Sequence, residues 1–444
     1  MKERMQDFFW GIQDKFYDIK EKLFVSKEDQ DADGEDDFIV EEKSLSSEWE
    51  EEREPSMWLK MGQWLLYYMK RYRVLLFLVI MLTSVVIGFV VYNRMVTFDG
   101  YMVAATYENS VSAGTRYRAI GKDILKYNSD GVTCVSRNND IRWSITYSMQ
   151  SPVTDVCDTT MVIAEQHGNQ VFVVNEDGQL GSFKTDLPIL RACVSRQGVA
   201  AVMLQEEEVT WINLYRPDGT LIASDKTKIT ESGYPLAMDL SPDGQRMAVS
   251  YVGIADGVLT DTVSFYHFGA AGQEEKNNLV GSEKFDGVTI PVVYYADNSH
   301  IVAVTDSGFA VFEGADRPKK SESVDFGTEI ISSFHEDDLI GFVLDNEGTE
   351  NRYRIEVYNL GGKQKMMVET DYNYSNIKMQ NGQILIYNDK SCMAYTSSGH
   401  QWFYSNYEKE VTDFYYFSEY RKYLIITQDS FDRIRIGKQG GGES

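Results

Sequence analysis

The feature that most constrains the fold of this 444-residue chain is a tight turn that recurs at near-regular spacing. Each turn follows a short run rich in Val, Ile, Tyr and Phe, and successive turns are 37 to 50 residues apart. The turns lie near Asn139, Gly178, Gly219, Gly269, Gly314, Gly362 and Gly399. Four short strands repeated every 40 to 50 residues or so are typical of β-propeller blades, which protect strand edges by radial repetition. We therefore predict an all-β fold, a β-propeller.

The number of blades follows from the turns and from what remains at the end of the chain. Seven turns give seven blades, and residues 411–417, 423–427 and 433–436 add three strands without a fourth. Residues 101–107 form a strand-like run that can supply it and close the ring. We predict eight blades, with seven as the alternative.

A run of 20 residues without a charged side chain sets the topology. It spans residues 74–93, VLLFLVIMLTSVVIGFVVYN, and Arg73 and Arg94 flank it. A helix of about 20 apolar residues is long enough to cross a bilayer. The run lies too far from the N-terminus for a cleavable signal peptide, so it is predicted to be an uncleaved signal anchor. Four basic residues between positions 60 and 73, against Arg94 alone beyond the run, place the N-terminus in the cytoplasm and the C-terminal domain outside.

The segments on either side of this run differ in composition. Apolar residues three or four apart in residues 1–24 predict an amphipathic helix, which is partner-binding or self-associating, or else lies on a membrane surface. Residues 27–54 hold 14 acidic and 3 basic side chains, which predicts disorder. The predicted segments are an amphipathic cytoplasmic helix (1–24), an acidic linker (25–56), a juxtamembrane amphipathic segment (57–73), a transmembrane helix (74–93), a connector (94–116), a propeller (117–436) and a disordered tail (437–444).

Charge excludes one class of partner. The formal net charge of −25 divides into −7 for residues 1–73 and −18 for the remainder, so both parts are acidic and would repel nucleic acid. Asp29, Asp31, Asp33 and Gly34 match the opening of a calcium-binding EF-hand loop, but Val40 stands where the bidentate glutamate is required. We interpret this segment as solvated acidic chain.

No motif predicts catalytic, cofactor-binding or metal-binding residues. The sequence has no G-x-S-x-G elbow, no P-loop and no adjacent cysteine pair. Its four cysteines lack metal-site spacing and are interpreted as buried small side chains, and its five histidines are scattered and interpreted as surface or loop residues. Trp143, Trp211 and Trp402 recur at strand positions and are expected to pack between sheets rather than to line a ligand surface.

Two stretches carry a family resemblance. DGVTCVSRNNDIRW (130–143) resembles the repeat of quinoprotein-type (PQQ-like) propellers, and SPDGQRMAVS (241–250) resembles WD-type and Tol-type repeats. With residues 231–251 and VSFYHF (263–268), the chain resembles an uncharacterised family of membrane-anchored propellers from Gram-positive Firmicutes, over about residues 70–436. The resemblance implies a single-pass bacterial membrane protein and supplies no activity, because that family has no assigned function.

Three functional hypotheses follow. The favoured one is a non-enzymatic interaction or scaffold module of the cell envelope, with a protein partner outside and a cytoplasmic partner at residues 1–54. The alternative is a carbohydrate-active enzyme or glycan-binding protein whose carboxylates converge at the central channel. The third is signalling across the membrane through a dimer, for which Ser84 and Gly88 form a small-xxx-small pattern.

Overall fold

The computed structural model describes residues 73–110, 112, 114–255, 257–346, 348–417 and 419–438. The predictions for residues 1–24, 25–56 and 57–72, for the EF-hand-like stretch and for residues 439–444 lie outside the described residues. The chain divides into two compact units, residues 1–82 and 83–444. The second unit contains every strand of the described chain.

The first described element is the helix α3 (Arg73–Met95), which covers the uncharged run. Its described side chains include Phe77, Leu82 and Phe89, each more than 60% exposed. Among the residues that the structure describes, no helix is both long enough and apolar enough to span a membrane. The predicted span at residues 74–93 therefore stays a prediction.

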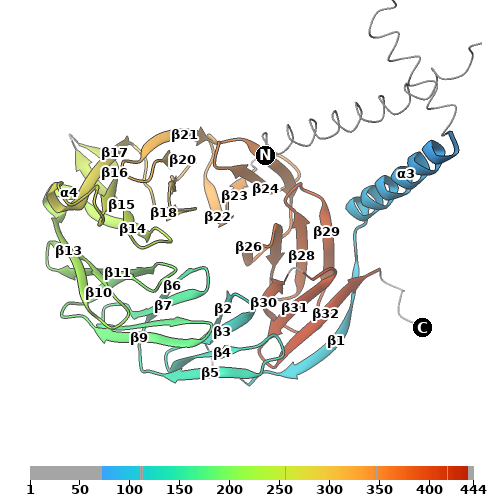
Figure 1. Cartoon of the computed structure of the whole chain (residues 1–444), viewed down its shortest axis with the longest axis horizontal. Coiled ribbons are helices and arrows are strands. Elements are labelled where there is room, and N and C mark those ends of the chain that lie inside the picture. Colours follow the sequence, from blue (N-terminus) through green and yellow to red (C-terminus); the bar gives the residue numbers. More distant parts are fainter. Residues whose placement is uncertain are drawn as a thin grey trace, which may run out of the picture. The chain divides into compact units, whose positions relative to one another are not determined.

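The described strands form eight four-stranded antiparallel sheets, which confirms the eight-blade propeller and excludes the seven-blade alternative. Figure 1 shows the sheets arranged as a ring, with the first strand of each blade nearest the centre. Blades 1 to 4 comprise β2 (Arg116–Ile120), β3 (Asp123–Tyr127), β4 (Gly131–Val135) and β5 (Ile141–Thr146); β6 (Pro152–Cys157), β7 (Thr160–Glu165), β8 (Gln170–Asn175) and β9 (Gly178–Lys184); β10 (Ile189–Val194), β11 (Ala200–Glu206), β12 (Val209–Tyr215) and β13 (Leu221–Lys228); and β14 (Tyr234–Leu240), β15 (Arg246–Ala255), β16 (Val258–His267) and β17 (Leu279–Asp286).

The second half of the ring continues the same order. Blades 5 to 8 comprise β18 (Val292–Tyr295), β19 (His300–Val304), β20 (Gly308–Glu313) and β21 (Lys319–Asp325); β22 (Ile330–Glu336), β23 (Leu339–Asp345), β24 (Tyr353–Asn359) and β25 (Gln364–Thr370); β26 (Asn376–Gln380), β27 (Gln383–Tyr387), β28 (Ser391–Thr396) and β29 (Gln401–Asn406); and β30 (Val411–Tyr416), β31 (Lys422–Thr427), β32 (Ser430–Gly437) and β1 (Gly100–Glu108). Two short helices, α4 (Ile229–Ser232) and η1 (Lys276–Asn278), lie in connections.

The seven turns identified in the sequence all join a third strand to a fourth. Six of the seven turn residues have a positive φ, for example 64° at Asn139 and 85° at Gly219. Glycine and asparagine tolerate this left-handed backbone better than other residues do. Gly269 is the exception, because the connection there is longer and contains η1. Local turn chemistry thus marks the blade period.

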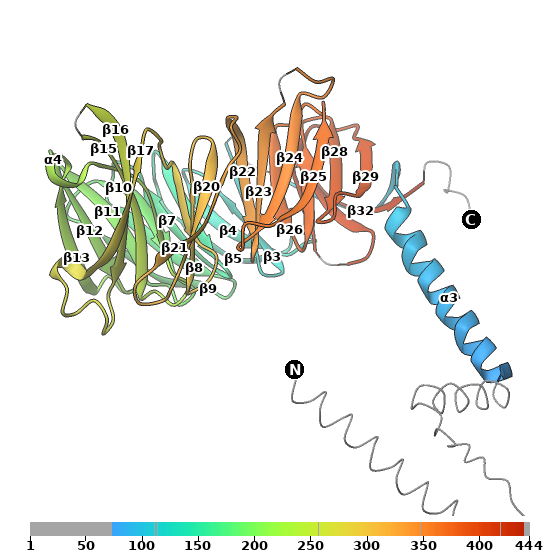
Figure 2. The same cartoon turned by 90° about the horizontal axis from the view of Figure 1, so that it is seen from above.

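The core is divided among the blade interfaces. Eight clusters of buried apolar side chains each join two neighbouring blades, and together they include all eight pairs around the ring. Alternate residues of a middle strand face opposite neighbours: Ile301 of β19 packs toward blade 4, and Val302 packs toward blade 6. A strand buried on both faces reads as a continuous apolar run, which explains sequences such as ILIY and HIVAV. Figure 2 shows the ring edge-on.

Ring closure joins the two ends of the second unit. The strand β1 pairs with β32 in antiparallel register, from Gly100 opposite Gly437 to Glu108 opposite Ser430. It is the outer strand of blade 8, the position that the sequence assigned to residues 101–107. Just before it, Phe98 pairs with β29, and its ring packs edge-on against Trp402 with the centroids 5.0 Å apart. The seam is thus held by two adjacent blades.

Candidate functional site

The inner strands carry charged side chains into the centre of the ring. The middle of β2 holds Arg118, the middle of β26 holds Lys378, and Asp413 lies near the start of β30. On the other side of blade 1, β6 and β14 carry Asp155 and Asp239. Several first strands of adjacent blades contact one another, among them β6 with β10, β10 with β14 and β22 with β26, and Figure 1 shows the first strands facing the centre of the ring.

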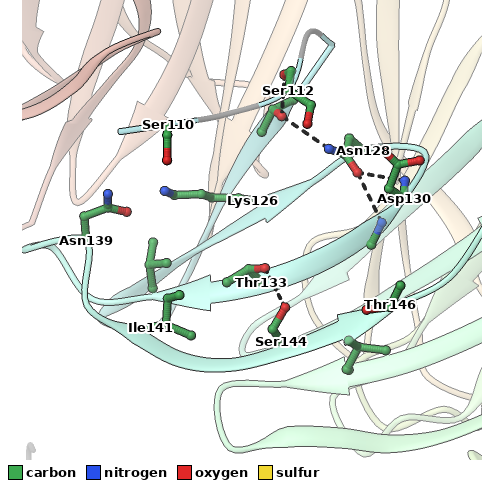
Figure 3. Close-up of a pocket in the computed structure, with 14 residues that line it drawn as sticks. Ser110, Ser112, Lys126, Asn128, Asp130, Thr133, Asn139, Ile141, Ser144 and Thr146 are labelled. Carbon is green, nitrogen blue, oxygen red and sulfur yellow. Dashed lines mark hydrogen bonds between the residues drawn. The ribbon is translucent and has the colours of Figure 1, made fainter. Parts of the chain in front are cut away.

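Four cavities adjoin one another along this part of the ring. The first, the blade-1 cavity, has a volume of about 360 Å³ and is shown in Figure 3. The second, the channel cavity, has about the same volume and is bounded by β2, β26 and the start of β30. A third cavity of about 390 Å³ shares Arg116 and Tyr127 with the channel cavity, and a fourth of about 210 Å³ shares Val153 and Gln166 with the third.

The blade-1 cavity is lined mainly by hydroxyl and amide groups. Figure 3 shows the amine of Lys126 pointing toward Ser110 and Asn139. That amine donates a hydrogen bond to Asn109 Oδ1 at 2.8 Å, and burial lowers the pKa of Lys126 to about 8. The hydroxyls of Thr133 and Ser144 lie 2.9 Å apart and satisfy each other. This cavity can hold a small polar molecule, but its lining provides no paired acid and base.

The channel cavity is built around Asp413, whose carboxylate accepts four hydrogen bonds. Its Oδ1 accepts from Lys378 Nζ at 2.5 Å, from Tyr387 Oη at 2.5 Å and from the Phe414 amide at 2.8 Å. Its Oδ2 accepts from Tyr415 Oη at 2.6 Å. Three of these donors come from side chains on two blades, so the carboxylate links blade 7 to blade 8.

Ionisation in this cluster follows from burial and from the Asp413 charge. Burial lowers the pKa of Lys378, and the neighbouring carboxylate opposes that shift. Burial, followed by the Asp413 charge, raises the pKa of Tyr387 and of Tyr415 far above the ordinary value, so both phenols stay protonated donors. The Lys378 amine also lies 3.5 Å from the Tyr415 ring centroid. The amine, the carboxylate and the two phenols therefore act as one unit.

Asp155 and Asp239 are the carboxylates that a carbohydrate-active site at the channel would require. Burial raises the pKa of both, and the charge of Asp155 raises that of Asp239 further. Each carboxylate also binds a backbone amide of the next blade, Asp155 at Val194 (2.9 Å) and Asp239 at Tyr295 (2.7 Å). In this arrangement each carboxylate joins two blades, and one of its oxygens is committed to that bond.

The tryptophans and cysteines singled out in the sequence can each be placed by their packing and hydrogen bonds. The indole of Trp143 donates to Glu176 O of blade 2 at 3.0 Å, Trp211 packs with the cluster between blades 2 and 3, and Trp402 packs on Phe98. All four cysteines are free thiols, and three of them are buried. No cluster of metal-binding side chains occurs among the residues that the structure describes.

One histidine departs from the surface interpretation. His267 is only 4% exposed, and its Nδ1 accepts a hydrogen bond from the Gly269 amide at 3.0 Å. The long connection to β17 folds over its ring, which a short hairpin turn would leave in solvent. No pattern in the sequence indicates the path of this connection.

The residues that line the channel were not predicted from the sequence. A usable signal exists in the inner strands RYRAI, NIKMQ and VTDFYY, where a charged residue interrupts a run that otherwise packs between blades. A charge at the middle of a strand buried on both faces is costly unless it has partners. The partners come from other blades and cannot be read from one strand.

A comparison with protein-family models identifies one match, to the Family of unknown function (DUF5711), over residues 94–436. The chain belongs to this family. The match covers the DUF5711 propeller from just before β1 to the end of β32. No curated protein is similar to the chain.

Several solved structures are similar to this DUF5711 chain at low sequence identity. BamB from Moraxella catarrhalis is 10% identical, with a TM-score of 0.46, covering 76% of this chain and 100% of that one. A chain of the Mitotic Checkpoint Complex is 8% identical, with a TM-score of 0.42, covering 77% and 98%. Hsv2p from Kluyveromyces lactis is 11% identical, with a TM-score of 0.39, covering 66% and 97%.

Proposed function

We propose that this protein is a non-enzymatic, membrane-anchored propeller that serves as a protein-interaction or scaffold module in the bacterial cell envelope. The observation that carries the proposal is an apolar hairpin that extends beyond blade 4. A propeller supports this role because its connections can change without disturbing the strands that hold the ring.

The hairpin is the part of β15 and β16 that has no neighbouring strand. These strands pair with each other as far as Ala255 opposite Val258. Pairing of β14 ends at Val252, and pairing of β17 begins at Thr260, so residues 253–255 and 258–259 form a two-stranded extension. Its large apolar side chains are Ile254, Val258 and Leu259, which are 79%, 48% and 42% exposed. Clustered exposed aliphatic side chains favour contact with the apolar surface of another protein.

The membrane anchor is proposed from α3 and its flanks. The run at residues 74–93 has no charged side chain, and α3 continues as a helix through all of it. Most of its described apolar side chains are at least half exposed. The four basic residues between positions 60 and 73 favour a cytoplasmic N-terminus, which places the propeller outside the cytoplasm.

In-cell crosslinking followed by affinity purification of the full-length protein tests this function. A variant carrying both Ile254→Ser and Leu259→Ser removes the apolar tip without touching the blade core. We expect it to lose at least one stoichiometric partner that the unaltered protein retains. The matched control is Met367→Ser on β25, which removes an apolar side chain that is 57% exposed on a different blade.

A second comparison addresses the cytoplasmic side. A protein lacking residues 1–54 is expected to lose a different set of partners from the hairpin variant, because the two regions lie on opposite sides of the membrane in this proposal. Recovery of no protein partner, together with binding or cleavage of envelope glycans by the unaltered protein, would contradict the scaffold function.

A further inference from the structure

The lining of the channel cavity has a net positive charge, whereas the molecule as a whole is acidic. The chain carries a net charge of −25, and its propeller region is acidic as well. Yet the ionised groups that line the channel cavity are Arg116, Arg118, Lys378 and Asp413, three cations and one carboxylate with a net charge of +2. The lining of the adjoining third cavity contains no carboxylate among the described residues, and Arg116 is its one charged residue.

The guanidinium groups of Arg116 and Arg118 are available to bind a ligand. The two arginines are two positions apart on β2, so both side chains leave the same face of the strand, with Cα atoms about 6.7 Å apart. Both are exposed, and neither forms an ion pair or a side-chain hydrogen bond with the described residues. Within reach are the side chains of Thr115, Asn376 and Thr412, which also line the cavity and can donate hydrogen bonds.

Asp413 does not neutralise this pair. Its two oxygens accept from Lys378, Tyr387, Tyr415 and the Phe414 amide, so its charge is dispersed over four donors. The guanidinium of Arg118 acts electrostatically on Lys378 and on both tyrosines, which places its positive charge beside the cluster rather than away from it. Arg118 also acts on the carboxyl group of Asp155, whose pKa burial nevertheless raises overall. Arg116 and Arg118 thus contribute two positive charges that have no ion-pair partner among the described residues.

We propose that the channel cavity binds a small dianionic ligand of the phosphate-monoester class, held by Arg116 and Arg118 at the mouth of β2. A guanidinium matches the planar pair of oxygens of a phosphate or carboxylate with two parallel hydrogen bonds. A phosphate monoester carries about −1.5 to −2 charges at pH 7, which matches the charge of the lining. The cavity volume of about 360 Å³ lies in the range of small-molecule sites. The site lies on β2, apart from the hairpin of blade 4, and adds a ligand to the proposed scaffold.

Calorimetric titration of the full-length protein in detergent, in phosphate-free buffer, tests this site. The probes are glycerol 3-phosphate, inorganic phosphate and succinate. We expect saturable binding of glycerol 3-phosphate at one site per chain, with affinity that falls as salt is raised. Arg118→Gln is expected to weaken binding on the order of tenfold or more, since it removes a charged hydrogen-bonding partner.

The matched control is Arg142→Gln on the outer strand β5. Arg142 is 57% exposed and pairs with Asp123 at 3.5 Å, away from the channel lining. We expect it to leave the affinity unchanged. The proposal is overturned if glycerol 3-phosphate shows no saturable binding, if Arg118→Gln binds as the unaltered protein does, or if succinate binds and both phosphate probes do not. The hairpin variant should bind the probe normally, so loss of a partner protein and loss of the ligand are distinguishable.

Discussion

Among single residues of this propeller, Asp225 is a buried residue whose carboxyl group has few hydrogen-bond partners. It lies on β13 and is 4% exposed. Its Oδ1 is 3.5 Å from Asn278 Nδ2, and its Oδ2 has no partner among the described residues. Burial raises the pKa of Asp225 to about 6, above the ordinary value of about 3.9 in an unfolded chain. The folded state therefore favours the protonated carboxyl group.

The sign of the effect follows from this shift. Below pH 4 or so the carboxyl is neutral in both states, and stability is lost as the pH rises toward 6 because the folded state resists ionisation. Asp225→Asn should raise the free energy of unfolding at pH 7 by about 2 kcal/mol and flatten its dependence between about pH 4 and pH 6. Urea unfolding across this range measures it. Asp186→Asn removes the same charge at an exposed position and should change little; equal effects of the two variants would refute the prediction.

At the scale of elements, the junction between the end of β1, blade 8 and blade 1 depends on Asn109. This residue is 2% exposed, and its backbone amide donates to Asp429 O. Its Nδ2 donates to Thr427 O at 2.8 Å and to Tyr117 Oη at 3.0 Å, while its Oδ1 accepts from Lys126. One amide side chain thus joins the end of β1 to blade 8 and to blade 1.

Replacing Asn109 with Ala leaves the half-buried Lys126 amine and the Thr427 carbonyl without these partners. We expect a loss of about 2 to 4 kcal/mol in the free energy of unfolding, because unsatisfied buried polar groups are costly. Hydrogen exchange should show the loss of protection concentrated in β1 and β32 rather than in β11. Asn213→Ala on β12 removes a more exposed amide and should cost less than about 1 kcal/mol. Uniform loss of protection around the ring would argue against a localised seam.

At the scale of the whole molecule, the four thiols report whether the ring opens as one unit. They lie in blades 1, 2, 3 and 7. Burial raises the pKa of Cys134 and of Cys157 to about 12, and it raises the pKa of Cys193 and Cys392 as well. Because the thiolate is the reactive form, we expect little alkylation of the native protein at pH 8, with Cys157 the fastest as it is half-buried.

Since each blade shares its core with two neighbours, a closed ring should lose all of its interfaces together. Alkylation at increasing urea concentrations, with each site measured by mass spectrometry, should therefore give one midpoint for Cys134, Cys193 and Cys392. Fully denatured protein, in which all four react, provides the reference. Separate midpoints for the three sites would show that blades open independently.

The sequence determined the features whose cause is local. Six of the seven spaced turn residues, Asn139 among them, have a left-handed backbone that few residues accept, so the period of the turns indicated seven of the blades. Continuous apolar runs identified middle strands buried on two faces, and the unpaired strands after residue 411 required the partner that β1 provides. The uncharged run at residues 74–93 sets a helix for the same reason, since composition over 20 residues is a local property.

Tertiary structure decided what depends on residues far apart in the chain. Arg118 and Lys378 line one cavity although they are separated by most of the propeller sequence, because ring closure sets blade 1 beside blade 8, which itself packs against blade 7. The burial of Asp225 and His267 depends on the path of the connection to β17, which no periodic pattern describes. A strand sequence specifies which faces are apolar, whereas the partners of a charge in that strand are fixed only when neighbouring blades meet.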